Sequence, residues 1–341
     1  EVLQQMGSRH VMVVHADDGM DEIGICCPTS VAELKDGQDS SYRIQPEDFA
    51  MATADISDIR VDGVDQSLAM IQSVLDNQAG PGLTTEHGFS LWIEADDRHI
   101  LFDTGQGPAL PMNARTLGVD LRQTDMVVLS HGHYDHTGGI PHALHVAPNA
   151  HVYCHPGVVQ PRYSLRNGSP KPAHMPSESM AALDRLPEKN LHWTSEAVML
   201  SENIGLTGPI PRQTTFEDTG GAFFLDPEAR HADPIEDDLA LWIKTDQGLV
   251  VCVGCCHAGI INTLTHIKRL SGVAPIRAVI GGLHLLNADS RRLNHTLAAM
   301  KTIPIETVIP CHCTGDRATD ELEAVMGAKA RRSSSGAIHH F

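Results

Sequence analysis

The spacing of apolar and polar residues predicts a regular domain from Ser90 onward. Short apolar runs alternate there with amphipathic stretches, and the first two runs fit a hairpin that turns through Asp96-Asp97. The runs predict strands over 90–95, 99–102, 127–129, 151–154, 239–244, 249–253, 278–280 and 307–309. Helical spacing covers 260–270 and 291–301. Strands and helices in this order predict an α/β fold with two sheets packed between helices.

Two segments depart from this alternation. Residues 156–211 are rich in Pro, Gly and Ser, and we expect this irregular insertion to lie over the functional site. The first eighty residues predict strands over 9–16, 29–34 and 41–44, and a helix over 65–77 through Leu68, Ile71, Val74 and Leu75. The chain therefore divides into a small α+β fragment, 1–80, and a larger domain, 81–341.

Composition excludes several classes of protein. The 341 residues contain 43 Asp and Glu against 25 Lys and Arg, and the formal charge of -18 argues against a nucleic-acid partner, because phosphates need a basic face. No apolar run approaches the ~20 residues that span a bilayer. The first residues lack the basic start and apolar core of a signal peptide. The eight Cys are not spaced as a disulfide framework, so we expect a cytoplasmic protein without a membrane partner.

The densest chemistry follows the predicted strand 127–129. His131, His133, Asp135 and His136 lie within six positions, just before Gly138-Gly139. A loop at a strand's end can turn several side chains toward one point. Neutral His and ionised Asp are ligands that Zn²⁺, Mn²⁺ and Fe²⁺ accept. The segment therefore predicts one or two divalent transition metal ions.

Three later histidines, His257, His284 and His312, each come just after an apolar predicted strand. Repeated placement of imidazoles after strands indicates further metal ligands. Which of His257 and His284 is a ligand stays open. Cys255 and Cys256 precede His257, and they are either thiolate ligands or, as the favoured interpretation, buried apolar thiols.

These residues match the H-x-H-x-D-H signature of the metallo-β-lactamase superfamily, which the chain resembles. Six further segments resemble the branch labelled dihydropterin-ribofuranosylaminobenzene-phosphate synthase: 86–90 (EHGFS), 102–105 (FDTG), 207–212 (TGPIPR), 254–259 (GCCHAG), 281–285 (GGLHL) and 310–315 (PCHCTG). The resemblance runs from about Leu83 to Gly315. It implies a metallo-β-lactamase αββα sandwich.

The resemblance also implies which residues bind metal. His131 and His133 would hold a first ion, and Asp135, His136 and His312 a second. The family's bridging Asp is replaced by the run 254–257, so His257, with His284 next, is the candidate for the remaining ligand.

Four residues around the metals have expected roles. Two metals lower the pKa of a shared water toward ~7 and stabilise charge on a phosphoryl oxygen, and Asp135 and His257 are the candidate catalytic residues. Arg212 is the candidate substrate-binding residue, because guanidinium binds phosphate through two parallel hydrogen bonds; the alternative is a solvated loop Arg. Asp103 either orients a ligand His or caps a turn.

The expected function is metal-dependent hydrolysis of a small phosphoester, a phosphate di- or triester, with esters or lactones as side substrates. The expected partner is a small-molecule substrate that is anionic or a phosphoester. The alternative is a synthase that joins an aminobenzoate-type ring to a phosphoribosyl group in pterin cofactor biosynthesis. A metal-storing or interaction protein is the least favoured class, since its ligands would leave no open coordination position.

The first eighty residues resemble the C-terminal part of anthranilate phosphoribosyltransferase. The matching segments are 7–11 (GSRHV), 15–22 (HADDGMDE), 28–34 (PTSVAEL) and 46–49 (PEDF). The family's glycine-rich phosphoribosyl-pyrophosphate loop has no counterpart, so we expect no transferase activity. The strand that usually precedes the hydrolase-like sequence is also missing. We therefore expect the fragment, or a second subunit in a homodimer, to cover the open sheet edge.

Overall fold

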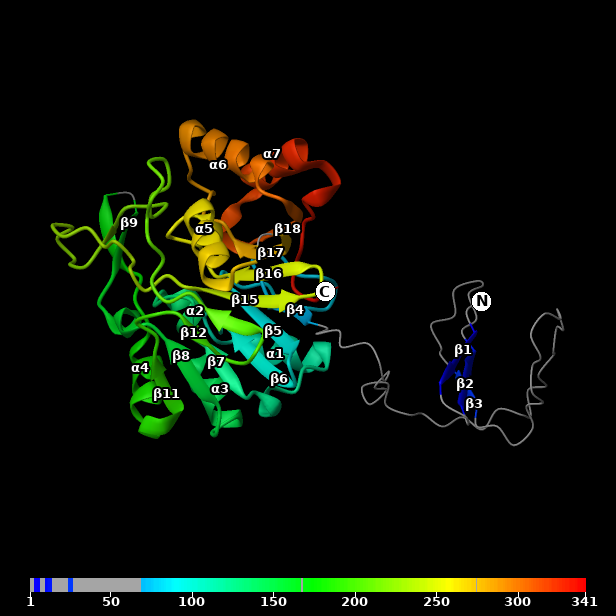
Figure 1. The fold of residues 1–341 in the computed structure, drawn as a ribbon. Coiled ribbons are helices and arrows are strands. Elements are labelled where there is room, and N and C mark those ends of the chain that lie inside the picture. Colours follow the sequence, from blue (N-terminus) through cyan, green and yellow to red (C-terminus); the bar gives the residue numbers. More distant parts are fainter. Residues whose placement is uncertain (1–2, 7–9, 14–23, 27–68, 167, 274) are drawn as a thin grey trace. The chain divides into compact units, whose positions relative to one another are not determined.

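The computed structural model describes residues 3–6, 10–13, 24–26 and 69–341, except 167 and 274 (Figure 1). The chain divides into two compact units, Glu1–Asp65 and Gln66–Phe341. In the first unit, an antiparallel sheet is formed by β1 (Leu3–Met6), β2 (His10–Val13) and β3 (Gly24–Cys26). β2 lies within the strand predicted over 9–16. The strands predicted over 29–34 and 41–44 lie outside the described residues.

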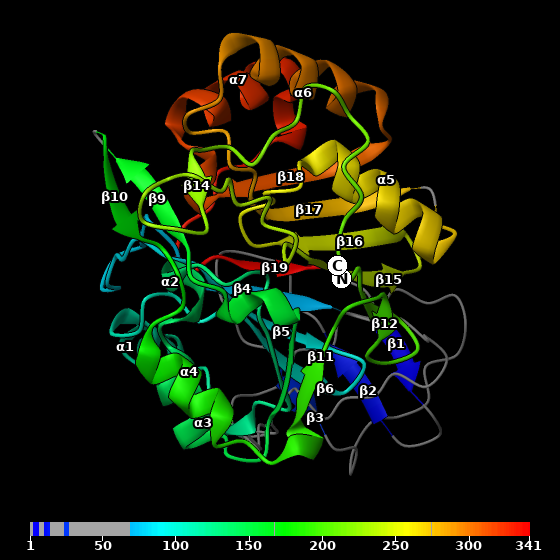
Figure 2. The ribbon, with the colours of Figure 1, turned by 90° about the vertical axis from the view of Figure 1, so that its left-hand side faces the viewer.

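The second unit is a sandwich of two mixed sheets between two layers of helices, as Figure 2 shows. In order across the first sheet, the strands are β11 (Leu191–Trp193), β8 (His151–Cys154), β7 (Met126–Val128), β6 (Arg98–Phe102), β5 (Ser90–Ala95), β4 (Met70–Leu75) and β19 (Ile338–His340). In the second sheet they are β12 (Val198–Met199), β13 (Ile204–Leu206), β15 (Ala240–Thr245), β16 (Gly248–Val253), β17 (Ile276–Gly282) and β18 (Ile305–Cys311).

Helices cover the outer face of each sheet. The first sheet packs against α1 (Ala109–Leu117), α3 (Ile140–Val146) and α4 (Ser177–Asp184), and the second against α5 (Ile260–Ser271), α6 (Ser290–Thr302) and α7 (Asp316–Met326). A central core between the sheets joins residues such as Phe102 and Ile93 to Leu241 and Ile280. None of the helices in the described part of the chain is long and apolar enough to cross a membrane.

The predictions for the regular part are confirmed. A strand lies at each of the eight positions predicted from Ser90 onward, and α5 and α6 lie where helical spacing was recognised. The β5–β6 hairpin turns through Asp96 and Asp97, whose φ angles are 50° and 54°. Two successive positive φ angles are typical of a type I′ turn, which matches the twist of the flanking strands.

The helix predicted over 65–77 is wrong where the structure describes it, because Met70–Leu75 is strand β4. β4 pairs with β5 on one side and with β19 on the other. Ile71 enters the core between the sheets, while Val74 and Leu75 enter the layer beneath the helices. A short strand buried on both faces gives an apolar run whose spacing also fits a helix. The first strand is therefore present, and β19 covers its edge.

The prediction of one irregular insertion over 156–211 is also wrong in its extent. Residues from Ser177 onward form α4, β11, β12 and β13, which belong to the sandwich itself. A separate small sheet, β10 (Ser169–Pro172), β9 (Tyr163–Arg166) and β14 (Phe223–Phe224), lies beside α2 (Tyr134–Thr137), the short helix of the His-rich loop (Figure 2). Only the first third of the predicted insertion therefore lies beside the His-rich loop.

Candidate metal centre

The candidate site is built at the carboxyl ends of strands from both sheets. β7 leads into the loop His131–His136, β16 into Cys255–His257, β17 into His284, and β18 into His312. Parallel strands bring their carboxyl ends to one edge of a sheet, and the two packed sheets bring both edges together. All seven predicted metal ligands are near one another for this reason.

Several residues at these strand ends have left-handed backbones. The φ angles are 59° at Asp103, 56° at Cys256, 45° at His284 and 50° at His312. Such conformations are costly for residues with a side chain and are concentrated at functional sites. The strain turns each side chain away from the strand direction, so the rest of the site must hold it in place.

Close packing fixes the His131–His136 loop. A Cβ on Gly132 would lie 2.2 Å from the carbonyl oxygen of Val158, so no larger residue fits there. The backbone N–H of Gly132 donates to Asp237 Oδ2 at 2.8 Å. Tyr134 N–H donates to the carbonyl of Ala173 at 3.1 Å, which ties the loop to the segment that follows β10.

Four imidazoles are anchored by their outer nitrogens. The Nδ1 atom of His136 lies 2.7 Å from Asp103 Oδ2, and that of His257 lies 2.7 Å from the Thr219 carbonyl. His312 Nδ1 lies 2.9 Å from Asn77 Oδ1, and His131 Nδ1 lies 2.9 Å from the Ser130 hydroxyl, which itself donates to Asp103. Each partner accepts a hydrogen bond, so each Nδ1 carries the proton. The Nε2 atoms of all four rings therefore face inward, and each offers a lone pair when its ring is neutral.

The inner faces of these rings have the donor pattern of a metal site. His136 Nε2 lies 3.2 Å from His312 Nε2 and 3.2 Å from Cys255 Sγ, and His131 Nε2 lies 2.9 Å from His133 Nδ1. Two nitrogens on a tetrahedral Zn²⁺ would be about 3.3 Å apart. Among the described side chains, buried ring nitrogens of His133, His257 and His284 have no hydrogen-bond partner. A divalent cation would satisfy lone pairs that otherwise face each other.

The donors fall into overlapping sets whose ligand atoms lie within 4.8 Å of one another. The sets are His131, His133 and His257; His131, His136 and Cys255; Cys255, His257 and His284; Cys255, His312 and Cys313; and His87, Asp135 and His312. The first set describes a first metal position, in which His257 joins the two His that the resemblance placed there. Asp135, His136 and His312 surround a second position. The geometry thus favours His257 over His284 at the first position.

Burial and charge divide the site into two electrostatic environments. Burial lowers the pKa of His131, His133 and His257 well below the ordinary value, which keeps these rings neutral and able to bind metal. Burial also lowers the pKa of His136, but Asp103 and Asp135 outweigh it and raise that pKa to about 9. Burial raises the pKa of Asp135, yet the surrounding imidazoles hold it well below its usual range. Asp135 is therefore ionised.

Asp103 has the orienting role that was one of its two predicted roles. Besides its contact with His136, its carboxylate accepts the backbone N–H and the hydroxyl of Ser130, both at 2.7 Å. A carboxylate behind a ligand His fixes the ring and raises its basicity.

Arg212 does not have a free guanidinium. Its terminal nitrogens donate to the backbone carbonyls of His257 and Pro234, both at 2.6 Å, and to that of Ile235 at 3.5 Å. These contacts hold together the two turns that carry His257 and Asp237. Because these contacts occupy the guanidinium, we expect a structural role for Arg212; its predicted contact with substrate is untested.

Sequence reasoning missed His87, Asp76 and Asn77, and it favoured a packing role for Cys255 over the alternative of a thiolate ligand. His87 Nε2 lies 3.1 Å from Asp135 Oδ2, and Cys255 belongs to three of the five donor sets. Asp76 Oδ1 accepts the backbone N–H of His312 at 2.9 Å, beside the Asn77 contact. Asp76 and Asn77 follow a strand directly, as the other site residues do. The helix prediction over 65–77 concealed that signal.

Aromatic side chains close one side of the site. The centre of the Phe223 ring, on β14, lies 4.9 Å from that of His133, 5.3 Å from that of His257 and 6.0 Å from that of His284.

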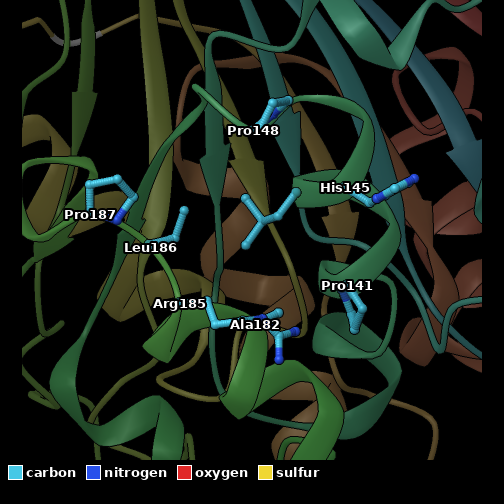
Figure 3. Close-up of a pocket in the computed structure, with 8 residues that line it drawn as sticks. Pro141, His145, Pro148, Ala182, Arg185, Leu186 and Pro187 are labelled. Atoms are coloured by element: carbon cyan, nitrogen blue, oxygen red, sulfur yellow. The ribbon is translucent and has the colours of Figure 1, made fainter.

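Elsewhere, a hollow of about 280 Å³ lies between α3 and α4, lined by residues such as Pro141, Ala182 and Pro187 (Figure 3). None of the candidate ligands lines that hollow, so we assign it no chemistry.

Comparison with known proteins agrees with this geometry. The model of the glycosyl transferase family a/b domain matches residues 1–94, and that of the metallo-beta-lactamase superfamily matches residues 83–312. The first match extends past the boundary between the two units, so its last part includes β4 and β5 of the sandwich.

Three relatives illustrate the two parts of the chain. The 7,8-dihydropterin-6-methyl-4-(beta-D-ribofuranosyl)-aminobenzene-5'-phosphate synthase of Methanocaldococcus jannaschii is 28% identical over 75% of this chain and 90% of its own length. A solved structure of Tm1679, a metal-dependent hydrolase of the beta-lactamase superfamily, is 30% identical with a TM-score of 0.68, over 80% of this chain and 98% of that one.

The third relative is the anthranilate phosphoribosyltransferase of Thioalkalivibrio sulfidiphilus, 61% identical over 24% of this chain. The chain spans only 24% of that enzyme's length, so it matches a fragment of it. The superfamily match covers most of the chain and contains every predicted metal ligand. The two-sheet sandwich and the His-rich strand ends lead to the same conclusion: the chain belongs to the metallo-β-lactamase superfamily.

Proposed function

We propose that this chain is a metal-dependent synthase that joins an aromatic ring compound to a phosphate-activated partner, in the assembly of a pterin-linked ribofuranosylaminobenzene phosphate. The observation that carries the proposal is the similarity to the Methanocaldococcus synthase over 90% of that enzyme's length. The alternative interpretation of the sequence was also a synthase of pterin cofactor biosynthesis, although it joined an aminobenzoate-type ring to a phosphoribosyl group. The comparisons support a synthase over phosphoester hydrolysis.

The described site suits such a reaction because it offers metal ligands, and the hydroxyls beside them are engaged in hydrogen bonds. The hydroxyl of Ser130 donates to Asp103, and that of Thr137 donates to the carbonyl of His133. A bound divalent metal supplies Lewis acidity that stabilises charge on a phosphate oxygen. The reaction then joins the two substrates directly. The carbon–oxygen bond to the phosphate leaving group breaks, and a bond to the aromatic compound forms.

The acceptor must also lose a proton, and the chain places a carboxylate and an imidazole where that proton can leave. Asp135 is buried, and its Oδ2 lies 3.1 Å from Nε2 of His87, whose side chain is 46% exposed. We assign Asp135 the acceptance of the proton and His87 its transfer to solvent.

Hydrolysis of a phosphoester is the second candidate, and the similarity to a metal-dependent hydrolase over 98% of its chain favours it. Water would replace the aromatic acceptor, while the same residues would hold the same metals. The two candidates differ in what attacks, an aromatic compound or water. They also differ in the atom attacked, which is the carbon that bears the phosphate leaving group in the synthase and the phosphorus in the hydrolase.

A paired assay separates them. The full chain, loaded with Zn²⁺, is given a dihydropterin-6-methyl diphosphate with or without 4-(ribofuranosyl)aminobenzene 5'-phosphate, and mass spectrometry follows joined and hydrolysed products. We expect joined product only when both substrates and metal are present, and none after chelation. Phosphate release at the same rate without the acceptor would favour the hydrolase. Neither product from metal-loaded protein would contradict both.

A further inference from the structure

The site holds more metal-binding side chains than two metal ions bound only by nitrogen and oxygen would need. Asp135 and the five histidines around the two positions already make a set of six. The structure adds two thiols, Cys255 and Cys313, whose sulfur atoms lie within 4.8 Å of each other and of a His312 ring nitrogen. Both residues are buried and neither is in a disulfide.

Cys255 lies at the centre of the donors. It shares a set with His131 and His136, another with His257 and His284, and a third with His312 and Cys313. Its sulfur approaches His136 Nε2 to 3.2 Å. A ligand that reaches both metal positions is placed to touch either ion.

The backbone makes room for the second thiol. A Cβ on Gly282 would lie 2.5 Å from Cys313 Sγ, so only glycine at that position leaves the sulfur its place. Gly220 has the same relation to His284, since its Cβ would lie 2.0 Å from that ring's Cδ2 atom. Glycine at these two positions therefore leaves room for the Cys313 thiol and for the His284 ring.

The other thiols near the site are used differently. Cys256 Sγ lies 3.4 Å from the Thr263 hydroxyl, and Cys311 Sγ donates to the Ile309 carbonyl at 3.4 Å. Neither belongs to a donor set among the described residues. Cys313 Sγ also donates to the Cys255 carbonyl, at 3.7 Å, so membership in a donor set is what separates Cys255 and Cys313 from the other two thiols.

We propose that Cys255 and Cys313 bind the second metal as thiolates together with His312, so that this position selects a soft, zinc-class ion over Mn²⁺ or Mg²⁺. Thiolate donors favour Zn²⁺, whereas carboxylate and water donors suit Mn²⁺ and Mg²⁺. Two thiolates and the Asp135 carboxylate also offset most of the charge of two divalent ions in a buried site. The proposal concerns the same metal centre as the proposed function, but it holds for either reaction.

Co²⁺ substitution of the full chain tests the proposal without any substrate. A cobalt–thiolate bond gives a sulfur-to-metal charge-transfer band in the near ultraviolet. We expect this band in the parent chain, and about half its intensity in Cys255→Ser and in Cys313→Ser, because each removes one of two thiolates. Cys256→Ser and Cys311→Ser are the matched controls and should keep the full band.

An undiminished band in Cys255→Ser and Cys313→Ser, or an equal loss in the two controls, would overturn the proposal. Zinc X-ray absorption of the unaltered chain decides the matter even if a variant fails to fold. We expect a sulfur shell at about 2.3 Å beside nitrogen and oxygen at about 2.0–2.1 Å. A shell of nitrogen and oxygen alone would also overturn the proposal, whatever reaction the chain catalyses.

Discussion

The outer nitrogen of His312 is held by a residue 235 positions earlier in the chain: His312 Nδ1 lies 2.9 Å from Asn77 Oδ1. Asn77 also donates from Nδ2 to the His312 carbonyl at 3.3 Å, and Gly88 N–H fixes the amide oxygen from the other side. Asn77 thus holds a ligand with a strained backbone at two points. The segment that carries it was predicted to belong to the transferase-like fragment.

Asn77→Ala should weaken metal binding at the second position by roughly 10–100-fold, the usual effect of removing a partner behind a ligand His. Isothermal titration with Zn²⁺ measures this. Gln78→Ala is the control, because Gln78 makes only an exposed contact with Asp316. Equal affinities in the parent and Asn77→Ala would show that His312 orients without its partner.

His133→Ala should empty the first metal position while leaving the fold intact. Its Nδ1 contacts only another candidate ligand, His131, and its buried Nε2 has no hydrogen-bond partner among the described residues, so the loss of the ring mainly removes a ligand. Elemental analysis of the purified chain should show less bound metal, and circular dichroism should be unchanged. His174→Ala, at the neighbouring position paired with His133 across a β-bridge, should keep its metal. Full metal content in His133→Ala would refute the assignment.

Arg162→Ala should destabilise the second unit by about 3–5 kcal/mol at neutral pH, since it leaves buried carboxylates without their cation. Arg162 is 1% exposed; its Nε lies 2.8 Å from Asp233 Oδ2, and its NH1 donates to Asp237 at 2.7 Å. Urea unfolding measures the loss. Arg230→Ala, which removes an exposed pair with Glu228, should cost no more than about 1 kcal/mol.

The same variant has a predicted pH dependence. Burial raises the pKa of Asp233, and Arg162 opposes that rise. Without Arg162 the folded state holds the Asp233 proton more tightly than the unfolded state does. Stability lost at neutral pH should therefore return as the pH falls toward Asp233's raised pKa. A deficit that widens on acidification would contradict this account.

Two truncations should behave differently. Removing residues 1–65 leaves β4 and Asn77 in place, so the shortened chain should fold and bind metal. Removing residues 1–80 deletes β4, exposes the edges of β5 and β19, and takes away the partners of His312, so it should give insoluble or metal-poor protein. Soluble, metal-replete protein from the longer deletion would be evidence against the role of β4.

Arg212→Ala should lower turnover of anionic and neutral substrates by the same factor. Its guanidinium donates to three backbone carbonyls, including that of His257, so its loss should loosen the turn that carries this ligand. The ratio of kcat/KM for a phosphoester and a neutral ester measures the effect. A loss of kcat/KM confined to the phosphoester would instead support the predicted contact of Arg212 with an anionic substrate.

The fold and the types of ligand could be predicted from local sequence patterns. The residues that hold the ligands in place could not. The loop His131–His136 carries its ligands within six consecutive residues, α5 has clear helical periodicity, and β16 is a continuous apolar run. Asp76 and Asn77 gave no such signal, because their role depends on His312, far away in the sequence. The insertion was placed too broadly because Pro and Gly between 156 and 211 also punctuate the short elements α4, β11, β12 and β13.

Cys255 also shows what sequence alone cannot predict. A buried thiol after a strand has the same sequence signature whether it packs or binds. Only the positions of His136 and His312 around its sulfur distinguish Cys255 from Cys256.

The pairing of β4 with β19 places the ends of the second unit next to each other, with Ala69 and Phe341 exchanging both backbone hydrogen bonds at 3.0 and 2.9 Å. A domain whose ends meet can be opened elsewhere and rejoined there with a short linker. A circularly permuted version, cut at the Asp96-Asp97 turn, should therefore keep its metal centre. For the same reason, additional sequence can be attached before β4 without displacing any strand of the sandwich.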